Sequence, residues 1–384
     1  MKLSAETPWL ADPKGQALCA VLEQAGHQAL FVGGCVRNAV LGETASDVDI
    51  ATDAMPQQVT KLMRTAGFQP VPTGIEHGTV TVVIDGTGFE VTTFRRDVET
   101  NGRRAVVAFS DRIEDDARRR DFTMNALYAK PDGTILDPLG GLPDALARRV
   151  CFIEDAAMRI HEDSLRILRF FRFSAYYGDP DAGFDPEALA AIAQSLDGLD
   201  HLSAERVGAE MKKLLAARDP ARSIATMDQI GILARILPVL SLPALAPLVA
   251  LEEQTETQPE SLRRLAALNP IEAPDRLRLS RKEARILADL IQARDSTMSA
   301  KSLGYRLGRD RGWDALILRQ SALGQLVDQE AKSLVQSGSE SVFPVQASDL
   351  QPEFQGSALG EKLRELEAEW LASDMTLDRA TLLG

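Results

Sequence analysis

Two aspartates separated by one residue, Asp47 and Asp49, have the residue type and spacing that most directly suggest chemistry. In a strand over residues 47–52, alternate side chains share a face, so both carboxylates would point outward while Val48 and Ile50 point into the core. Carboxylates this close repel each other unless a cation lies between them. Divalent cations such as Mg²⁺ prefer oxygen ligands, and a pair of them can align phosphates with an attacking hydroxyl. A solvated acidic turn is the alternative for an isolated pair.

Gly33 and Gly34 end an apolar segment at residues 29–32 and precede a short helical segment. Because glycine has no Cβ, the backbone there can approach a triphosphate closely, with amide groups and a helix N-terminus aimed at it. Arg37, one turn into that helix, could clamp a phosphate oxygen.

Glu90 lies in a strand expected over residues 88–94 and is the candidate for a third metal ligand or for activation of an incoming hydroxyl. An exposed strand glutamate without a catalytic role is the alternative, and Asp85 is a competing candidate.

Residues 117–129 place three consecutive arginines before an aspartate and an apolar run. A solvated helix start is the usual interpretation of such a charge run. Beside a pair of metal-binding aspartates, the pattern instead predicts that Arg119 and Arg120 clamp phosphates. Asp121 would then hydrogen-bond a ribose hydroxyl, and Asn125 would contact sugar or phosphate.

A helix expected over residues 162–177 would carry a polar stripe with one member every three residues: Asp163, Arg166, Arg169 and Arg172. The opposite, buried side would carry Leu165, Ile167, Leu168, Phe170 and Phe171.

Asp163 and Arg166 could form an intrahelical ion pair worth a few tenths of a kcal/mol. They could also read a nucleobase, since a carboxylate accepts from an exocyclic amino group and a guanidinium donates to a ring nitrogen or carbonyl. Cytosine and adenine both present an amino donor beside a ring-nitrogen acceptor, whereas uracil and guanine present the reverse. Such a pair would accept C and A and reject U and G, with Arg169 and Arg172 as further nucleotide contacts.

The elements around these residues form a mixed sheet with helices in the first 140 or so residues. Helices are expected over residues 14–24 and 56–65, and strands over residues 29–32, 78–84, 88–94 and 105–109. Asp85-Gly86 is a hairpin turn signal. The charged segment 96–104, with Asn101-Gly102, is expected to be a flexible loop, because it has few apolar residues to anchor it.

After Asp137-Pro138-Leu139-Gly140-Gly141 the pattern becomes helical, with helices expected over residues 162–177, 186–196, 204–217 and 220–237. Ser203 is placed to cap the third of these, and residues 336–341 are the expected loosest connection. The pattern predicts segments 1–145, 146–218 and 219–384.

Composition limits the classes of protein. The apolar content of 45% and charged content of 26% are those of a globular protein, and no apolar run is long enough to span a membrane. Three scattered cysteines and the absence of an export signal predict a cytoplasmic protein without disulfides. The four histidines form no spaced ligand set. With a net charge of −13, any phosphate-binding surface must come from local arrangement.

Over residues 28–215 the chain carries, in order, the motifs GGCVRN with SDVDIAT, EHGTVTVV, FEVTTFRRDVETNGRRAVVAF, RRRDFTMNAL, DPLGG, EDSLRILRFFRF and LSAERVGAEMKKLL. Together they resemble the class II tRNA nucleotidyltransferase (CCA-adding enzyme) and bacterial poly(A) polymerase family. The resemblance implies an α+β chain: a polymerase-β-like nucleotidyltransferase head with a mixed sheet, then an all-α neck, body and tail. It implies Asp47 and Asp49 as metal ligands and Asp163 with Arg166 as the base-reading pair. Asn38 departs from the family's usual Asp, which predicts a local structural effect.

The function implied is template-independent addition of CCA to the 3′ end of tRNA, using CTP, ATP and Mg²⁺. Glu90 would orient or activate the 3′-hydroxyl, and the helical body and tail would hold the tRNA by its backbone and shape. The alternatives are a poly(A) polymerase, an enzyme that adds only CC or only A, and an inactive nucleotide-binding regulator. A poly(A) polymerase would be expected to carry a basic C-terminal extension, whereas the last 29 residues here are rich in Asp and Glu.

Overall fold

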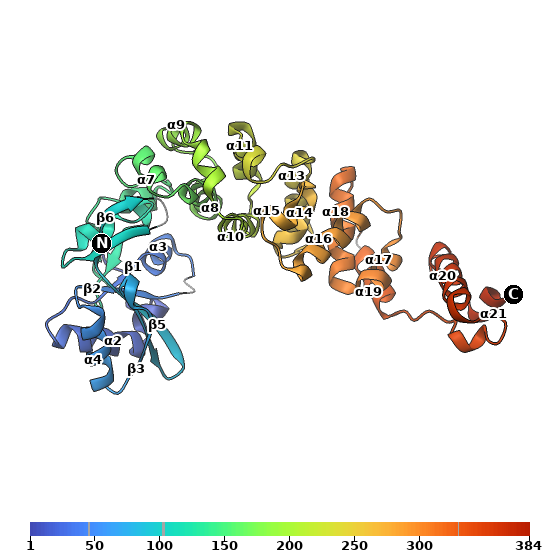
Figure 1. The fold of residues 1–384 in the computed structure, drawn as a ribbon, viewed down its shortest axis with the longest axis horizontal. Helices are drawn as coiled ribbons and strands as arrows, with labels where there is room; N and C mark the ends of the chain where they lie inside the picture. Colours follow the sequence, from blue (N-terminus) through green and yellow to red (C-terminus); the bar gives the residue numbers. More distant parts are fainter. Residues whose placement is uncertain (45–46, 102–103, 329) are drawn as a thin grey trace. The chain divides into compact units, whose positions relative to one another are not determined.

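The computed structural model describes residues 1–44, 47–101, 104–328 and 330–384. They form two compact units, Met1–Leu202 and Ser203–Gly384 (Figure 1). The predicted division after residues 145 and 218 stays a prediction. Within the described residues, no helix is both long and apolar enough to cross a membrane. All three cysteines carry free thiols.

One mixed sheet organises the first unit. Its described strands are β1 (Leu30–Val32), β2 (Asp49–Thr52), β3 (Gln69–Gly74), β4 (Thr79–Ile84), β5 (Thr87–Thr93), β8 (Tyr128–Ala129) and β9 (Ile135–Leu136). They lie in the order β3-β4-β5-β2-β1-β8-β9, and β2 pairs with β5 in parallel while the other pairs are antiparallel. The expected β4–β5 hairpin is confirmed: its turn residues Asp85 and Gly86 both have positive φ, as a two-residue hairpin loop requires.

Helices cover this sheet and continue beyond it. In the first unit they are α1 (Pro8–Ala11), α2 (Pro13–Gln24), α3 (Gly34–Leu41), α4 (Pro56–Thr65), α5 (Ile113–Arg118), α6 (Leu142–Leu146), α7 (Ala156–Glu162), α8 (Leu165–Tyr177) and α9 (Pro186–Gln194), with short 3₁₀ turns at Ile75–His77, Thr123–Asn125 and Leu196–His201. Helix α4 begins at Pro56, as predicted, and buries Val59 and Met63. The mixed α+β class of this part of the chain is confirmed.

The segment expected to be a flexible loop, residues 96–104, is largely a strand, so that expectation is wrong. Strand β6 (Arg95–Asn101) pairs antiparallel with β7 (Arg104–Phe109) to form a separate hairpin. Backbone pairing with the apolar β7 sequence overrides the charged composition of β6, because the sheet ladder uses main-chain groups. Residues 102–103, the expected turn, lie outside the described residues.

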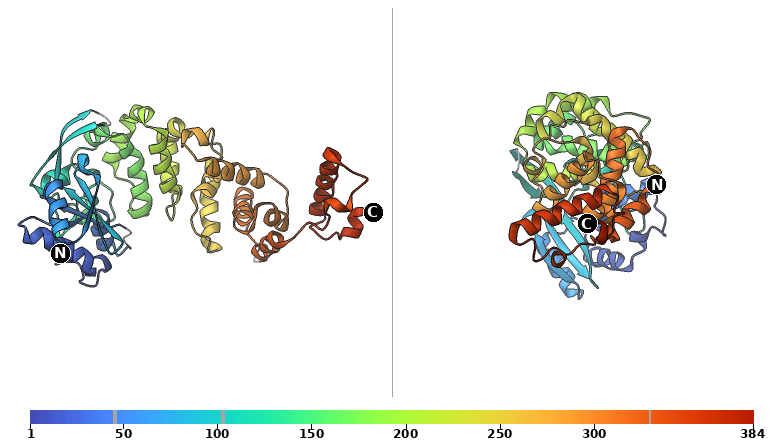
Figure 2. Two further views of the ribbon diagram at one scale, coloured as in Figure 1. Left: turned by 60° about the horizontal axis from the view of Figure 1, so that its bottom comes forward. Right: turned by 90° about the vertical axis from the view of Figure 1, so that its right-hand side faces the viewer.

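The described elements of the second unit are helices (Figure 2). They are α10 (Ala204–Leu215), α11 (Ala221–Ile230), α12 (Ile232–Ile236), α13 (Leu245–Gln254), α14 (Ser261–Leu268), α15 (Ala273–Arg276), α16 (Arg281–Arg294), α17 (Ala300–Leu307), α18 (Arg309–Leu323), α19 (Ala331–Glu340), α20 (Gly356–Ala372) and α21 (Arg379–Leu383), with 3₁₀ turns at Leu242–Ala244 and Ala347–Asp349. The helix expected over residues 220–237 is split at Gly231, which has a φ of 91°. Ser203 stands at the N-cap of α10, but its side chain makes no capping hydrogen bond.

The expectation of a loose connection at residues 336–341 is wrong, because α19 runs through it to Glu340. A Cβ on Gly338 would lie 2.0 Å from the Lys301 carbonyl oxygen, and a Cβ on Gly304 would lie 1.9 Å from that of Val335. Only glycine permits this approach of α19 to α17. Its small residues therefore mark a close helix–helix contact instead of a loop.

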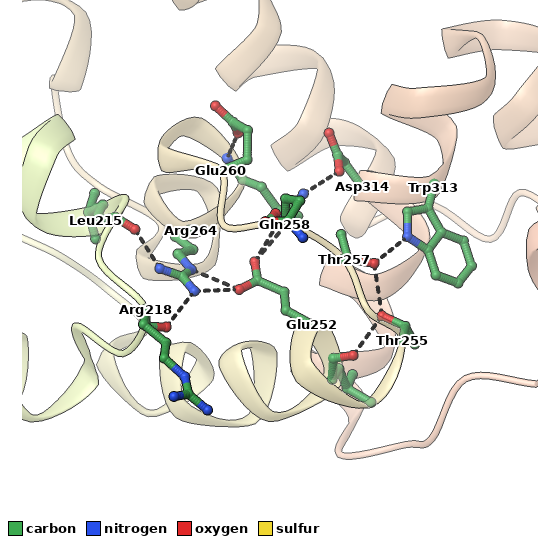
Figure 3. Close-up of polar contacts among 12 residues, drawn as sticks. Leu215, Arg218, Glu252, Thr255, Thr257, Gln258, Glu260, Arg264, Trp313 and Asp314 are labelled. Carbon is green, nitrogen blue, oxygen red and sulfur yellow. Dashed lines mark hydrogen bonds and ion pairs between the residues drawn. The ribbon is translucent and has the colours of Figure 1, made fainter. Parts of the chain in front are cut away.

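A buried charge cluster joins four helices of the second unit (Figure 3). Glu252 of α13 is 2% exposed and ion-pairs at 2.7 Å with both Arg263 and Arg264 of α14. Arg264 also donates to the carbonyls of Leu215, Ala217 and Arg218 at the end of α10, and Arg263 reaches Asp314 of α18 at 2.5 Å. The cluster therefore satisfies the final carbonyl of α10 and two carbonyls of the segment that follows it.

Candidate active site

The parallel pairing of β2 with β5 places two of the predicted catalytic carboxylates side by side. Asp49 stands directly opposite Glu90 in the ladder. Burial raises the pKa of Asp49, and the nearby charges of Glu90 and Asp47 raise it further, while Arg120 acts in the opposite direction. Two of the three predicted carboxylates, Glu90 and Asp47, therefore lie close enough to affect the third, Asp49.

Strand β2 begins at Asp49, so the expectation of a strand starting at residue 47 is wrong. Asp47 is exposed and precedes the strand. The segment that leads into β2 therefore sets the position of Asp47, and the alternation of side chains along the strand does not.

A cavity of about 450 Å³ opens beside Asp49. Its lining includes most of the predicted nucleotide-binding set: Gly33, Gly34, Arg37, Arg119, Arg120, Asp121, Asn125, Asp163, Arg166 and Arg169. The lining also includes Arg95, Asp116 and Phe173, which the sequence did not suggest. Asp47, Glu90 and Arg172 do not line it. Arg172 packs on the ring of Phe173, with its guanidinium carbon 4.5 Å from the ring centroid.

The glycine pair gives Arg120 its place in this cavity. Gly33 has a φ of 72°, and a Cβ built on it would lie 3.1 Å from Nη1 of Arg120. A side chain here would be strained and would press on the guanidinium. Gly33 thus brings Arg120 against the turn that leads into the N-terminus of α3.

Asp116 and Tyr128 hold Arg120 in place by hydrogen bonds. Arg120 donates to an Asp116 oxygen at 3.0 Å and to the Tyr128 hydroxyl at 3.3 Å, and that hydroxyl donates to the same Asp116 oxygen at 2.7 Å. Burial alone would raise the pKa of Asp116, but the Arg120 charge and the Tyr128 hydrogen bond outweigh it and lower the pKa.

Arg37 is largely enclosed by protein groups. Its guanidinium donates to Asn125 at 2.5 Å, to the Tyr177 hydroxyl at 2.8 Å, and to Asn38 at 2.8 and 3.1 Å. The guanidinium carbon also lies 3.9 Å from the centroid of the Tyr177 ring. Burial lowers the pKa of Arg37. Among its described contacts, most of its N–H groups are taken by the protein.

Asn38, where the family pattern usually has Asp, links Arg37 to the loop after α3. Its amide oxygen accepts from Arg37, which leaves its NH₂ group to donate to the Thr44 carbonyl at 2.5 Å. An aspartate would pair its charge with Arg37 but could not make the second bond when ionised.

Asp121 links Asn125 to Arg169. One carboxylate oxygen accepts two hydrogen bonds from Arg169, at 2.7 and 2.5 Å, and the other accepts from Asn125 and from the Phe122 amide, both at 2.9 Å. Burial would raise the pKa of Asp121, but the Arg169 charge and these hydrogen bonds lower it. A ribose hydroxyl would have to compete with these donors, so the predicted ribose contact of Asp121 stays a prediction.

The expected single helix over residues 162–177 is wrong at its start. Helix α7 ends at Glu162, Asp163 is extended, and α8 begins at Leu165. The Asp163 carboxylate accepts from the Leu165 amide at 3.1 Å, which competes with helix continuation. The arginine stripe therefore lies on α8, whose buried face carries the predicted Leu165, Ile167, Leu168, Phe170 and Phe171.

Arg166 is held by a partner that the sequence analysis overlooked. It ion-pairs with Glu162 and donates to the carbonyls of Arg159 at 2.9 Å and Arg119 at 3.1 Å. Within the described contacts, Nε and one Nη2 hydrogen stay available to a ligand. Asp163 and Arg166 both line the cavity, as a base-reading pair requires.

The residues present fit a divalent cation. Among the described residues, no three His, Cys, Asp or Glu side chains form a complete metal-binding group. Mg²⁺ commonly uses only one or two protein carboxylates and completes its shell with water and phosphate oxygens. Asp49, whose pKa is raised by burial and by neighbouring carboxylates, and the exposed Asp47 are a donor set of that kind.

The overlooked site residues differ in how visible they are from sequence. Asp116 and Glu162 each precede their arginine by four residues, a spacing that predicts contact on a helix. Tyr128 and Tyr177 carry no such signal, because tertiary packing alone brings their hydroxyls to Arg120 and Arg37.

Comparison with known proteins agrees with this geometry. A family model described as the poly A polymerase head domain matches residues 29–151, and one described as a probable RNA and SrmB-binding site of polymerase A matches residues 183–242. A crystal structure of the Bacillus stearothermophilus CCA-adding enzyme in complex with CTP superposes with a TM-score of 0.73 at 26% identity, covering 94% of each chain.

Two curated relatives extend the match along the sequence. The CCA-adding enzyme of Levilactobacillus brevis is 40% identical over 213 residues, which are 55% of this chain and 52% of that protein. The mitochondrial CCA tRNA nucleotidyltransferase 1 of Mus musculus is 31% identical over 388 residues, covering 96% of this chain and 88% of that protein. With this similarity over nearly its whole length, the chain belongs to the CCA tRNA nucleotidyltransferase family.

Proposed function

We propose that this protein adds C, C and A in turn to the 3′ end of tRNA, using CTP and ATP and releasing pyrophosphate, with Mg²⁺ as its metal. The observation that carries the proposal is the register of β2 and β5. It places Asp49 opposite Glu90 at a cavity lined by arginines. A carboxylate that can bind a cation, a neighbouring carboxylate that can orient a hydroxyl, and guanidinium groups for phosphates together suit transfer of a nucleotidyl group by positioning and charge neutralisation.

Each of these site residues then has a defined task. Asp47 and Asp49 would hold the metal, which supplies charge for the phosphates and lowers the barrier to attack by the hydroxyl. Glu90, on the neighbouring strand, would orient the 3′-hydroxyl of the tRNA. Arg120 and Arg119 would bind phosphate oxygens, and no covalent enzyme intermediate is needed.

Base choice would come from Asp163 and Arg166. The carboxylate accepts from the amino group of C or A, and the available N–H groups of Arg166 donate to the ring nitrogen or carbonyl beside it. Glu162 and the two backbone carbonyls fix the direction of the guanidinium, which sharpens the choice because a fixed donor cannot follow a wrong base.

A poly(A) polymerase is the second candidate, because the family model of the head is named for that activity. The named relatives favour CCA addition. Both activities would use the same cavity, so the substrate must separate them.

The test offers tRNA ending at the discriminator base, at C or at CC, with each nucleoside triphosphate separately, and sequences the products. CTP should extend the first two substrates, ATP should extend only the third, and synthesis should stop after A. Open-ended adenylation of an unstructured oligonucleotide would support the poly(A) polymerase. No incorporation on any substrate would support the inactive regulator.

A further inference from the structure

Arg120, Asp116 and Tyr128 form a closed triangle of hydrogen bonds. Nε of Arg120 donates to the tyrosine hydroxyl, Nη2 donates to the carboxylate, and the hydroxyl donates to that same carboxylate oxygen. Asp116 is 2% exposed and Tyr128 is fully buried. These two buried groups therefore fix the position and the plane of the guanidinium along the edge that carries Nε and Nη2.

The other side of the Arg120 guanidinium lines the cavity. The Arg120 side chain keeps 26% of its surface exposed, and its Nη1 lies against Gly33 at the N-terminal end of α3. Nη1 has one long contact, 3.5 Å to the Asn125 carbonyl, and Nη2 has Asp116. Each terminal nitrogen carries a second hydrogen, which its described contacts leave for a ligand.

Tyr128 differs from the other two members because it carries no charge and does not line the cavity. It cannot touch a nucleotide itself. Its hydroxyl is nevertheless the group that joins Nε of Arg120 to Asp116, so it restrains rotation of the guanidinium about its ion pair. A guanidinium held in its binding geometry loses less freedom when it binds an anion.

We propose that Tyr128 is a positioning residue for the phosphate chain of the incoming nucleotide and for the pyrophosphate that leaves. Through its hydroxyl it holds Arg120 so that the terminal N–H groups meet phosphate oxygens beside the Gly33–Gly34 turn. The inference rests on the proposed function, because it assigns the phosphate subsite of the same cavity.

The test replaces Tyr128 with phenylalanine in the full chain, which removes one hydroxyl and keeps the ring. Removing a hydrogen bond of this kind corresponds to about a 3- to 10-fold change. The KM for CTP and the inhibition constant of pyrophosphate should rise by that same factor, with a smaller change in kcat and unchanged discrimination between CTP and UTP. Neither constant depends on the fraction of protein that is folded, so partial unfolding cannot imitate the result.

A double-mutant cycle shows whether Tyr128 acts through Arg120. In an Arg120→Ala background, Tyr128→Phe should cause no further change in pyrophosphate affinity. The matched control is Tyr305→Phe in the second unit, where the hydroxyl likewise donates to a carboxylate, Glu367, at 2.7 Å. Tyr305→Phe should lower the melting temperature about as much as Tyr128→Phe does. It should leave the KM for CTP and the inhibition constant of pyrophosphate unchanged.

Calorimetric titration with Mg²⁺ and pyrophosphate needs no tRNA, so it tests the inference separately from the proposed reaction. Pyrophosphate affinity within twofold of wild type in Tyr128→Phe would overturn the assignment. Equal loss in the presence and absence of Arg120 would do the same, since Tyr128 would then support the fold in general. If the wild-type chain binds pyrophosphate but does not extend tRNA, the proposed function fails while the positioning role can still be measured.

Discussion

The cavity of the first unit and the buried cluster of the second unit are both built from arginines and carboxylates, yet they use their charges differently. In the cluster, Arg264 directs its guanidinium N–H groups at Glu252 and at three main-chain carbonyls. It is 1% exposed, and Glu252 is 2% exposed. In the cavity, Arg120 and Arg166 each donate some of their guanidinium N–H groups to protein acceptors. Their other N–H groups stay available to a ligand in the cavity.

The number of arginines in a region therefore says little about whether it binds an anion. The number of guanidinium N–H groups that protein acceptors leave available says more. A saturated arginine stabilises the fold because removing one partner would leave a buried charge without compensation. A partly saturated arginine beside a cavity is held in place but can still bind an anion. The following predictions separate these two uses.

Removing either carboxylate that is proposed to bind the metal should have the largest effect on activity. Asp49→Ala or Asp47→Ala should lower the rate of nucleotide addition by about 10³-fold or more, because a lost metal ligand raises the barrier by several kcal/mol. Stability should hold or rise, since like charges are removed from the apo site. Single-turnover assays and urea denaturation measure the two quantities, with Asp132→Ala as the control from an exposed surface pair. Turnover within tenfold of wild type in either variant would contradict the metal assignment.

Removing the central carboxylate of the cluster should have the opposite pattern. Glu252→Gln leaves two buried guanidinium groups with less compensation and should lower the free energy of unfolding by about 3–5 kcal/mol. CTP binding to the folded protein should not change. Glu253→Gln is the matched control from the adjacent position, because its ion pair with Arg218 is mostly exposed and should contribute less than about 1 kcal/mol. Equal losses in the two variants would show that the cluster is not special.

Asp163 should affect selectivity more than stability. In Asp163→Ala, discrimination against UTP and GTP should fall by roughly one to two orders of magnitude, since a hydrogen bond to a charged group contributes about 1.5–3 kcal/mol. Misincorporation of all four nucleotides is measured beside the melting temperature. A lower melting temperature with unchanged selectivity would mean that Asp163 only ends α7 and starts α8.

The smallest expected effect concerns an ion pair at the surface of the second unit. Glu283 accepts from Lys212 at 2.7 Å and from the Ser280 amide at 2.7 Å, and these bonds lower its pKa from 4.5 to about 2. A depressed carboxyl pKa stabilises the fold above the unfolded value, and that contribution is lost as the pH falls from about 4.5 toward 2. Urea titrations of wild type and Glu283→Gln should therefore converge over this range, from a difference below about 1 kcal/mol at neutral pH. A difference that does not vary with pH would argue against this pair.

Local chemistry made several features predictable from the sequence. The Asp85-Gly86 turn, the start of α4 at Pro56 and the buried face of α8 follow from backbone preference and periodicity. The Asp47–Asp49 spacing indicated the acidic site even though only Asp49 lies in the strand. These are short-range properties, so neighbouring residues suffice to specify them.

Long-range contacts account for what the sequence did not show. The break at Asp163 is a local exception: the periodicity there is helical, but the Asp163 carboxylate accepts a hydrogen bond from the Leu165 amide two residues later. The sequence predicts a loose connection at residues 336–341 because nothing nearby in the chain indicates that α17 packs against Gly338. The parallel pairing that brings Glu90 to Asp49 joins strands with an intervening hairpin, and local patterns do not encode that register.

The residues that line the cavity also determine when it can exist during synthesis. Its lining begins at Gly33 and ends at Phe173 on α8, so a ribosome must translate the intervening chain before the site can close. At about 5–20 residues per second this interval is about 7 to 28 seconds. For most of that interval Asp47 and Asp49 have been synthesised but the arginines of α8 have not. A nascent chain is therefore unable to capture a nucleotide with the complete site until α8 has left the exit tunnel.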